Sequence, residues 1–171
     1  AAALGAGAQA VAVDVAQRFG RSILELGGNN AMVVMPSADL ELAARAITFA
    51  AVGTAGQRCT TLRRLIVHRD VAAPLLARLE KIYASVRVGD PLEDGVLVGP
   101  LVDRASFEQM QSALAQAREQ GGTVQGGERE CQALGEDAWY ARPALVRMPA
   151  QSAVVQHETF APILYVMGYK T

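Results

Sequence analysis

Short strand-like segments alternate along this chain with longer helix-like segments, and this alternation is the strongest limit on how it can fold. Ala31–Met35, Arg64–His68 and Ile163–Tyr169 read as strands, whereas Leu40–Val52 and the segment from Asp70 to about Val86 read as helices. Strands that alternate with helices are typical of parallel βαβ units. The sequence therefore predicts an α/β fold, with a mostly parallel sheet flanked by helices. Further strands are predicted at Ser22–Leu26, Thr123–Gln125, Ala144–Met148 and Ala153–Val155, and further helices at Val11–Phe19 and Asp103–Gln120.

Capping and turn residues mark the predicted limits of these elements. Asp39 and Asp70 precede helical runs as N-cap residues, and Gly20 follows the first helical run as a C-cap. The predicted helix Leu40–Val52 has apolar residues on nearly all of its sides, so we expect it to be buried. Segment 88–100 is rich in Gly, Asp and Pro, which predicts an ordered loop.

Composition and charge argue against several classes of function. The 171 residues carry 16 Lys and Arg, dispersed among 17 Asp and Glu, so we expect no basic face for nucleic acid. Apolar runs such as Ala161–Met167 are far shorter than a bilayer span, so we expect no membrane segment. Two cysteines without a C-x-x-C pair and two histidines do not predict a metal site, and they favour a reduced, cytoplasmic protein.

One cysteine lies in a glycine-bearing loop between two apolar segments, at Val52–Thr61. Gly53 and Gly56 let the backbone take conformations closed to other residues, and such a backbone can present a side chain in a tight pocket. Arg58 supplies a positive charge beside Cys59, which favours the thiolate or grips an anionic group. Cys59 is therefore a candidate nucleophile. The alternative is a small buried apolar residue beside a surface arginine.

An acidic residue interrupts the apolar run that ends at Gly27 and Gly28. Glu25 is either exposed at an edge or placed for catalysis. Burial would raise the pKa of its carboxyl group toward that of a general base. The residues alone leave both possibilities open.

Four motifs occur in a fixed order along the chain. They are Leu24-Glu25-Leu26-Gly27-Gly28, Gly56-Gln57-Arg58-Cys59, Gly89-Asp90-Pro91-Leu92 with Gly99-Pro100-Leu101, and Glu158-Thr159-Phe160-Ala161-Pro162. Their order and spacing resemble the NAD(P)-dependent aldehyde dehydrogenase superfamily. Residues 25 and 59 lie 34 positions apart, the separation that this family keeps between general base and nucleophile. Segments 26–31, 50–61 and 164–167 resemble the antiquitin-like branch, the α-aminoadipic semialdehyde dehydrogenases, and the resemblance covers the chain from about Val11 onward.

The resemblance implies a covalent mechanism. Cys59 would attack the aldehyde carbonyl as a thiolate, and its backbone N–H would donate a hydrogen bond to the oxyanion. Glu25 would activate the water that hydrolyses the resulting thioester. Arg58 would hold the carboxylate of an acidic semialdehyde, as the matching arginine does in the antiquitin-like branch.

The resemblance also implies a cofactor site for NAD, with NADP left open. Glu158 would bind the ribose on the nicotinamide side, Phe160 would pack near the ring, and the backbone of Leu26 and Gly27 would lie close to the nicotinamide. Without the family context, Glu158 would be a solvated acid and Phe160 a core residue. Ala161 stands where the family has glycine.

The resemblance implies that the chain is a fragment truncated at both ends. Residues 1–27 would be the tail end of the cofactor-binding domain, and residues 28–171 an incomplete catalytic domain. The alanine-rich start lacks a positive segment and an initiator methionine, so we interpret it as a cut end and not as a signal peptide. The whole enzyme would be a homodimer or homotetramer that acts on a small aldehyde, and the isolated fragment would be inactive.

Two other hypotheses stay open. In the first, Cys59 and Glu25 persist in a catalytically silent domain of the same family. In the second, Cys59 and His157 serve a cysteine-dependent acyl hydrolase, although no Ser/Cys-His-Asp framework is visible. Cys131 lies in a polar connection and is expected to have no catalytic role.

Overall fold

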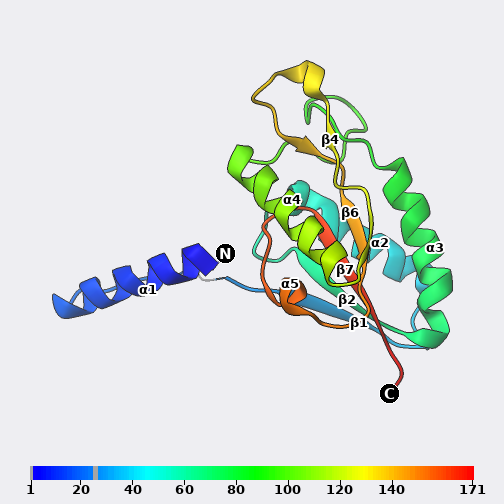
Figure 1. The fold of residues 1–171 in the computed structure, drawn as a ribbon, viewed down its shortest axis with the longest axis horizontal. Helices are drawn as coiled ribbons and strands as arrows, with labels where there is room; N and C mark the ends of the chain where they lie inside the picture. The colour runs from blue at the N-terminus through cyan, green and yellow to red at the C-terminus, as the bar shows by residue number, and fades with distance from the viewer. Residues whose placement is uncertain (1, 25–26) are drawn as a thin grey trace.

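A five-stranded sheet forms the centre of the computed structural model, which describes residues 2–24 and 27–171 (Figure 1). The strand order is β1-β2-β7-β6-β3. These strands are β1 (Asn30–Val34), β2 (Leu62–His68), β7 (Ile163–Tyr169), β6 (Ala144–Arg147) and β3 (Thr123–Gln125). The first four are parallel to one another, and β3 pairs with β6 in the antiparallel direction. The predicted α/β fold with a mostly parallel sheet is confirmed.

Helices cover both faces of this sheet. On one face, α2 (Leu40–Val52) packs against α3 (Arg69–Ser85). On the other face, α4 (Arg104–Glu119) packs against the short helix α5 (Ala153–Gln156). Figure 1 shows α4 in front of the sheet and α2 behind it. The core between these layers is apolar and includes Ile47, Leu65, Leu79, Met110, Val146 and Leu164, all fully buried.

The first helix, α1 (Ala2–Gln17), extends to one side of the sheet and its helices (Figure 1). Its C-terminal turn uses Phe19 in the left-handed region, with φ at 56°. Gly20 donates its N–H to Val15 O at 2.9 Å. The helix therefore ends close to the predicted place. None of the described helices is long and apolar enough to cross a membrane.

A strand was predicted at Ser22–Leu26, and the structure describes residues 22–24 of this segment. These three residues form no strand. Residues 22–24 belong to no helix or strand, and Ile23 is 94% exposed. An apolar run of this length forms a strand only where a neighbouring strand pairs with it, and these three residues have none. Glu25 and Leu26 lie outside the described residues.

Of the two predicted N-caps, Asp39 is confirmed and Asp70 is wrong. Asp39 accepts hydrogen bonds from the N–H groups of residues 41 and 42, and Asp103 accepts one from residue 106. The third helix begins one residue earlier than predicted. There the His68 ring accepts the N–H of Asp70, so Asp70 belongs to the first turn and its negative charge lies near the helix N-terminus.

Two other sequence-based expectations are wrong. The α2 helix is not buried all round, because Leu42 and Phe49 are 66% and 64% exposed. The run Ala153–Val155 forms the start of α5 and not a strand. Three apolar residues do not distinguish a strand from a helical turn. The turn is fixed instead by packing on α4, where the Gln120 side chain accepts the N–H of Val154 at 3.1 Å.

Irregular segments complete the chain. Residues 88–100 form the predicted ordered loop, with one isolated bridge between Val88 and Val98. The polar connection after β3 contains a small two-stranded sheet beside the main one. Its elements are β4 (Arg129–Glu130), η2 (Gln132–Leu134) and β5 (Tyr140–Ala141), and a further short helix, η1 (Gly53–Gly56), follows α2.

Candidate active site

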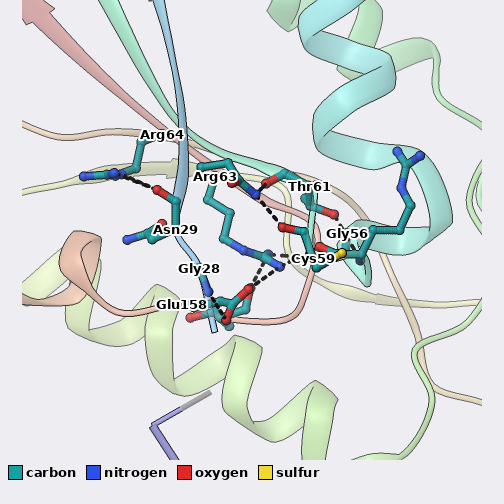
Figure 2. A network of polar contacts seen from close by, with 11 residues as sticks. Gly28, Asn29, Gly56, Cys59, Thr61, Arg63, Arg64 and Glu158 are labelled. Carbon is teal, nitrogen blue, oxygen red and sulfur yellow. Dashed lines mark hydrogen bonds and ion pairs between the residues drawn. The ribbon is translucent and has the colours of Figure 1, made fainter. Parts of the chain in front are cut away.

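The predicted site residues gather where three parallel strands begin. Asn30 opens β1, the Cys59 loop leads into β2, and Glu158 precedes β7. These strands are neighbours in the sheet, so segments far apart in sequence meet at one edge. Figure 2 shows this meeting point, with Gly28, Cys59, Arg63 and Glu158 drawn close together.

The loop that presents Cys59 begins with an unusual backbone turn. Thr54, Ala55 and Gly56 follow α2 with φ values of 55°, 51° and 69°. A left-handed conformation costs a non-glycine residue of the order of 1 kcal/mol, so this turn must be held by its surroundings. At Gly56 this turn lies directly against the backbone of Ala161. A β-carbon on residue 56 would lie 2.4 Å from the Ala161 carbonyl carbon.

Hydrogen bonds fix the backbone on both sides of Cys59. The Asn30 side chain donates to Cys59 O at 2.6 Å and to Thr61 O at 3.0 Å. Thr61, fully buried, accepts the N–H of Arg58 on its hydroxyl at 3.1 Å and donates its own N–H to Arg58 O at 3.0 Å. Cys59 itself is exposed. The loop therefore holds an accessible thiol on a fixed backbone.

The Cys59 N–H is free to serve an oxyanion. Among the described residues, no group accepts a hydrogen bond from it. Backbone N–H groups of this kind stabilise the negative oxygen that forms when a nucleophile attacks a carbonyl. The resemblance implies this donor role for residue 59.

Glu158 lies in a charged contact that the sequence did not predict. Its side chain is only 7% exposed, and its Oε1 lies 3.1 Å from Nη2 of Arg63, which is itself 2% exposed. Its Oε2 accepts the N–H of Gly28 at 3.2 Å. The carboxylate is thus not a solvated acid. It is held between β2 and the segment that precedes β1.

Phe160, Gly27 and Gly28 surround this carboxylate with apolar surface and exposed backbone. The Phe160 ring is 37% exposed, and the Arg63 guanidinium lies 5.1 Å from its centre. Gly27 and Gly28 are exposed, and among the described residues no atom lies within 4 Å of a β-carbon built on Gly28.

Arg58 points its guanidinium toward the end of α2. Its Nη2 donates to Phe49 O at 3.3 Å, and the group lies 5.3 Å from the centre of the Phe49 ring. A β-carbon on Gly53 would come within 2.5 Å of the same Nη2, so the glycine makes room for it. Arg58 therefore adjoins Cys59 through the backbone, while its charge lies over an exposed aromatic ring.

The Gly99-Pro100-Leu101 motif is tied to the Cys59 loop through Gln57. The Gln57 side chain donates to Pro100 O at 3.3 Å and accepts the N–H of Val102 at 2.9 Å. These contacts explain why a motif outside the site accompanies it in sequence. At Ala161 the backbone stays outside the left-handed region, so a side chain is accommodated there.

The structure adds residues that the sequence analysis missed. Asn30 and Arg63 make contacts to the Cys59 loop, and Thr61 closes it. Asn30 and Thr61 lie inside the segments that resemble the antiquitin-like branch, so a signal was present for them. Arg63 follows the apolar Leu62, and nothing local indicates its burial.

Two residues weighed as alternatives lie apart from this chemistry. The Cys131 thiol donates to Val88 O at 3.3 Å, and desolvation raises its pKa. His157 is exposed at the end of α5. Within the described part of the chain, no cluster of three His, Cys, Asp or Glu residues suits a metal ion.

Comparison with known proteins agrees with this fold. The model of the aldehyde dehydrogenase family matches residues 5–171, so the chain belongs to the aldehyde dehydrogenase family. Aldehyde dehydrogenase family 7 member A1 of Pisum sativum is 48% identical over 91% of this chain and 30% of its own length. The α-aminoadipic semialdehyde dehydrogenase of Bos taurus is 45% identical over 94% of this chain and 29% of its own length. The resemblance to this branch is confirmed, and the chain spans about 30% of the length of these relatives.

Solved structures give the same result. PnpE from Pseudomonas sp. WBC-3 matches 98% of this chain and 34% of its own with a TM-score of 0.92 and 30% identity. An NAD+ complex of aldehyde dehydrogenase from Bacillus cereus matches the same shares with a TM-score of 0.90 and 25% identity. The Cys59 loop and the Glu158 segment therefore lie within an aldehyde dehydrogenase fold.

Proposed function

We propose that these residues are the catalytic part of a nicotinamide-dependent aldehyde dehydrogenase, with Cys59 as its nucleophile. The observation that carries the proposal is the exposed Cys59 thiol on a backbone fixed by Asn30 and Thr61. A fixed thiol beside a free N–H donor suits attack on a carbonyl carbon. The whole protein would then convert an aldehyde to a carboxylic acid.

The chemistry follows from the positions of the donors. The Cys59 sulfur adds to the aldehyde carbon, and the oxygen that becomes negative accepts the N–H of Cys59. The carbon then loses a hydride, and the bond to sulfur becomes a thioester. Water cleaves that thioester, releases the acid and restores the thiol. We assign activation of the water to Glu25, whose side chain lies outside the described residues.

The groups around Glu158 fit a nicotinamide dinucleotide. When bound, this cofactor accepts the hydride and leaves as its reduced form. The Glu158 carboxylate would accept hydrogen bonds from the ribose hydroxyls, because two of its lone pairs are used by Arg63 and Gly28 and others remain. Phe160, Leu26 and Gly27 are proposed to lie near the nicotinamide ring. We favour NAD as the cofactor, with NADP as the alternative. Activity assays with each cofactor would distinguish the two.

We propose an acidic semialdehyde as the substrate class, because two features favour it. The relatives include α-aminoadipic semialdehyde dehydrogenases, and Arg58 directly precedes Cys59 in the chain, with its guanidinium over the Phe49 ring at the end of α2. Nη2 donates to Phe49 O and Nε is buried, so Nη1 is the guanidinium nitrogen that remains for a carboxylate. A cytoplasmic, homodimeric or homotetrameric enzyme is part of this proposal. The 171 residues alone are proposed to be inactive, since they cover about 30% of the relatives' length.

Replacing Arg58 tests the substrate class. In the full-length protein, Arg58→Ala should lower kcat/KM for an acidic semialdehyde by about 10- to 100-fold, the value of one charge-assisted hydrogen bond. A neutral aldehyde of the same length is the control and should change little. Gly53→Ala, which displaces the guanidinium without removing its charge, should act in the same direction. An unchanged preference for the acidic aldehyde in Arg58→Ala would rule out the role.

Cofactor dependence separates the proposal from its two rivals. Full-length protein should reduce NAD or NADP when an aldehyde is added, and it should not oxidise the aldehyde without cofactor. A silent domain would show neither reaction, although its exposed Cys59 thiol would still be accessible to a thiol probe. A cysteine-dependent acyl hydrolase would cleave esters but leave the nicotinamide unreduced.

A further inference from the structure

Arg63 brings a positive charge into the protein interior at the start of β2. It is 2% exposed, although arginine is rarely buried without paired partners. Burial lowers its pKa, and the negative charge of Glu158 opposes that shift. Arg63 therefore lies beside an acidic partner in a place that water scarcely reaches.

The guanidinium joins two segments that are distant in sequence. Nη1 donates to Gly56 O at 3.3 Å and to Thr159 O at 2.6 Å. Nη2 donates to Arg58 O at 3.2 Å and lies 3.1 Å from a carboxylate oxygen of Glu158. Two of these acceptors belong to the loop before Cys59, and the other two belong to the proposed cofactor segment (Figure 2).

Stability alone does not require an arginine here. A buried ion pair adds little net stability compared with well-packed apolar side chains of similar volume, because both charges must be desolvated. A planar guanidinium is distinguished from other side chains by its several donors in a rigid arrangement. That property matters where several acceptors must be held at fixed distances at once.

We propose that Arg63 is a positioning residue that couples the cofactor site to the nucleophile loop. It fixes the Glu158 carboxylate toward the ribose, and the same group fixes the carbonyls of Gly56 and Arg58 on the approach to Cys59. Loss of Arg63 therefore changes both cofactor affinity and the reactivity of the thiol. This inference rests on the proposed function, since it assigns Glu158 to the cofactor.

The test measures cofactor binding and thiol reactivity separately in the full-length protein. Calorimetric titration gives the dissociation constant of NAD, and the rate of alkylation by iodoacetamide without NAD reports on Cys59. The variants are Arg63→Met, Glu158→Gln and the double variant. Arg63→Lys keeps the charge and serves if the Met variant fails to fold. Arg147→Met is the control, because it breaks the Arg147–Glu80 ion pair at the C-terminal end of β6, whereas Cys59 and Glu158 lie where their strands begin.

We expect NAD affinity and the alkylation rate of Cys59 to change together. Arg63→Met should weaken NAD binding by about 10-fold or more and alter the alkylation rate, with Arg63→Lys in between. The loss in the double variant should be smaller than the product of the two single losses, because Arg63 acts on NAD through Glu158. Arg147→Met should match the wild type in both measurements.

Three results would overturn the proposal. The first is NAD affinity and alkylation in Arg63→Met or Arg63→Lys equal to those of the wild type. The second is multiplicative losses in the double variant, which would make Arg63 and Glu158 independent. The third is a wild-type protein that binds no nicotinamide dinucleotide. Only this third result also removes the proposed function, so the two failures are distinguishable.

Discussion

Gly56 is the residue whose backbone most restricts the shape of the Cys59 loop. Its φ of 69° lies in the left-handed region, and the Ala161–Pro162 peptide occupies the place of a side chain. The close approach brings the Cys59 loop against the segment that carries Glu158. Any β-carbon at residue 56 would push these two segments apart.

Gly56→Ala should therefore destabilise the protein well beyond the cost of the left-handed backbone. The control is Gly95→Ala, because Gly95 has a φ of 79° but meets only the flexible tip of Arg87 at 3.0 Å. We expect Gly56→Ala to lose about 2 kcal/mol more unfolding free energy than the control, measured by urea denaturation. Equal losses would contradict a close backbone contact at Gly56.

Tyr83 is a second residue whose surroundings lead to a prediction about stability. Its hydroxyl is buried and has no hydrogen-bond partner among the described residues, and burial raises its pKa. Tyr83→Phe removes a desolvated polar group, so the unfolding free energy should rise by about 1 kcal/mol. Tyr169→Phe is the control, because the Tyr169 hydroxyl contacts Met35 Sδ at 2.9 Å. If Tyr83→Phe destabilises the protein as much as this control, the hydroxyl has a partner.

At the scale of elements, α2 and α4 each begin at an aspartate whose side chain caps the helix. Backbone hydrogen bonds lower the pKa of both carboxyls below 3.8, from Leu42 and Glu41 for Asp39 and from Ser106 for Asp103. A carboxyl whose pKa is depressed in the folded state contributes stability that is fully present above its unfolded pKa. That contribution is lost as the pH falls through the folded pKa.

A capping residue that does not titrate should therefore make the unfolding free energy depend less on pH under acidic conditions. We expect the unfolding free energy of Asp103→Asn to fall less than that of the wild type between pH 7 and about pH 3, because asparagine caps a helix without titrating. Urea denaturation at each pH measures this. Asp137→Asn, at an exposed position outside any helix, should titrate like the wild type. A parallel fall in Asp103→Asn and the wild type would contradict the capping role.

The elements that local signals control were predictable from the sequence. The α2 helix runs from Leu40 to Val52 as predicted, because Asp39 caps it and a glycine follows it. The start of α3 was missed because the His68 ring, an uncommon cap, accepts the N–H there. Residues 153–155 were missed because packing on α4 decides their conformation, and such packing leaves no periodic pattern in three residues.

At the scale of the whole molecule, the motifs mark segments that the fold brings together, but they do not predict the contacts that hold these segments. Cys59 and Glu158 were identified from the resemblance, and the structure brings their segments to neighbouring strands. Arg63 was not identified, because its acceptor Thr159 O lies 96 positions away and only the fold brings them together. The charged pair between two strand starts is therefore a property of the tertiary structure alone.

The central claim is that Cys59 is the nucleophile of an aldehyde-oxidising protein. The most direct measurement is the initial rate of NADH formation by full-length wild type, Cys59→Ser and Thr60→Ser with one semialdehyde. Thr60 is the exposed neighbour of Cys59 and serves as the control. We expect Thr60→Ser to match the wild type and Cys59→Ser to lose activity by ~10³-fold or more. A Cys59→Ser protein that keeps the wild-type rate would contradict the claim.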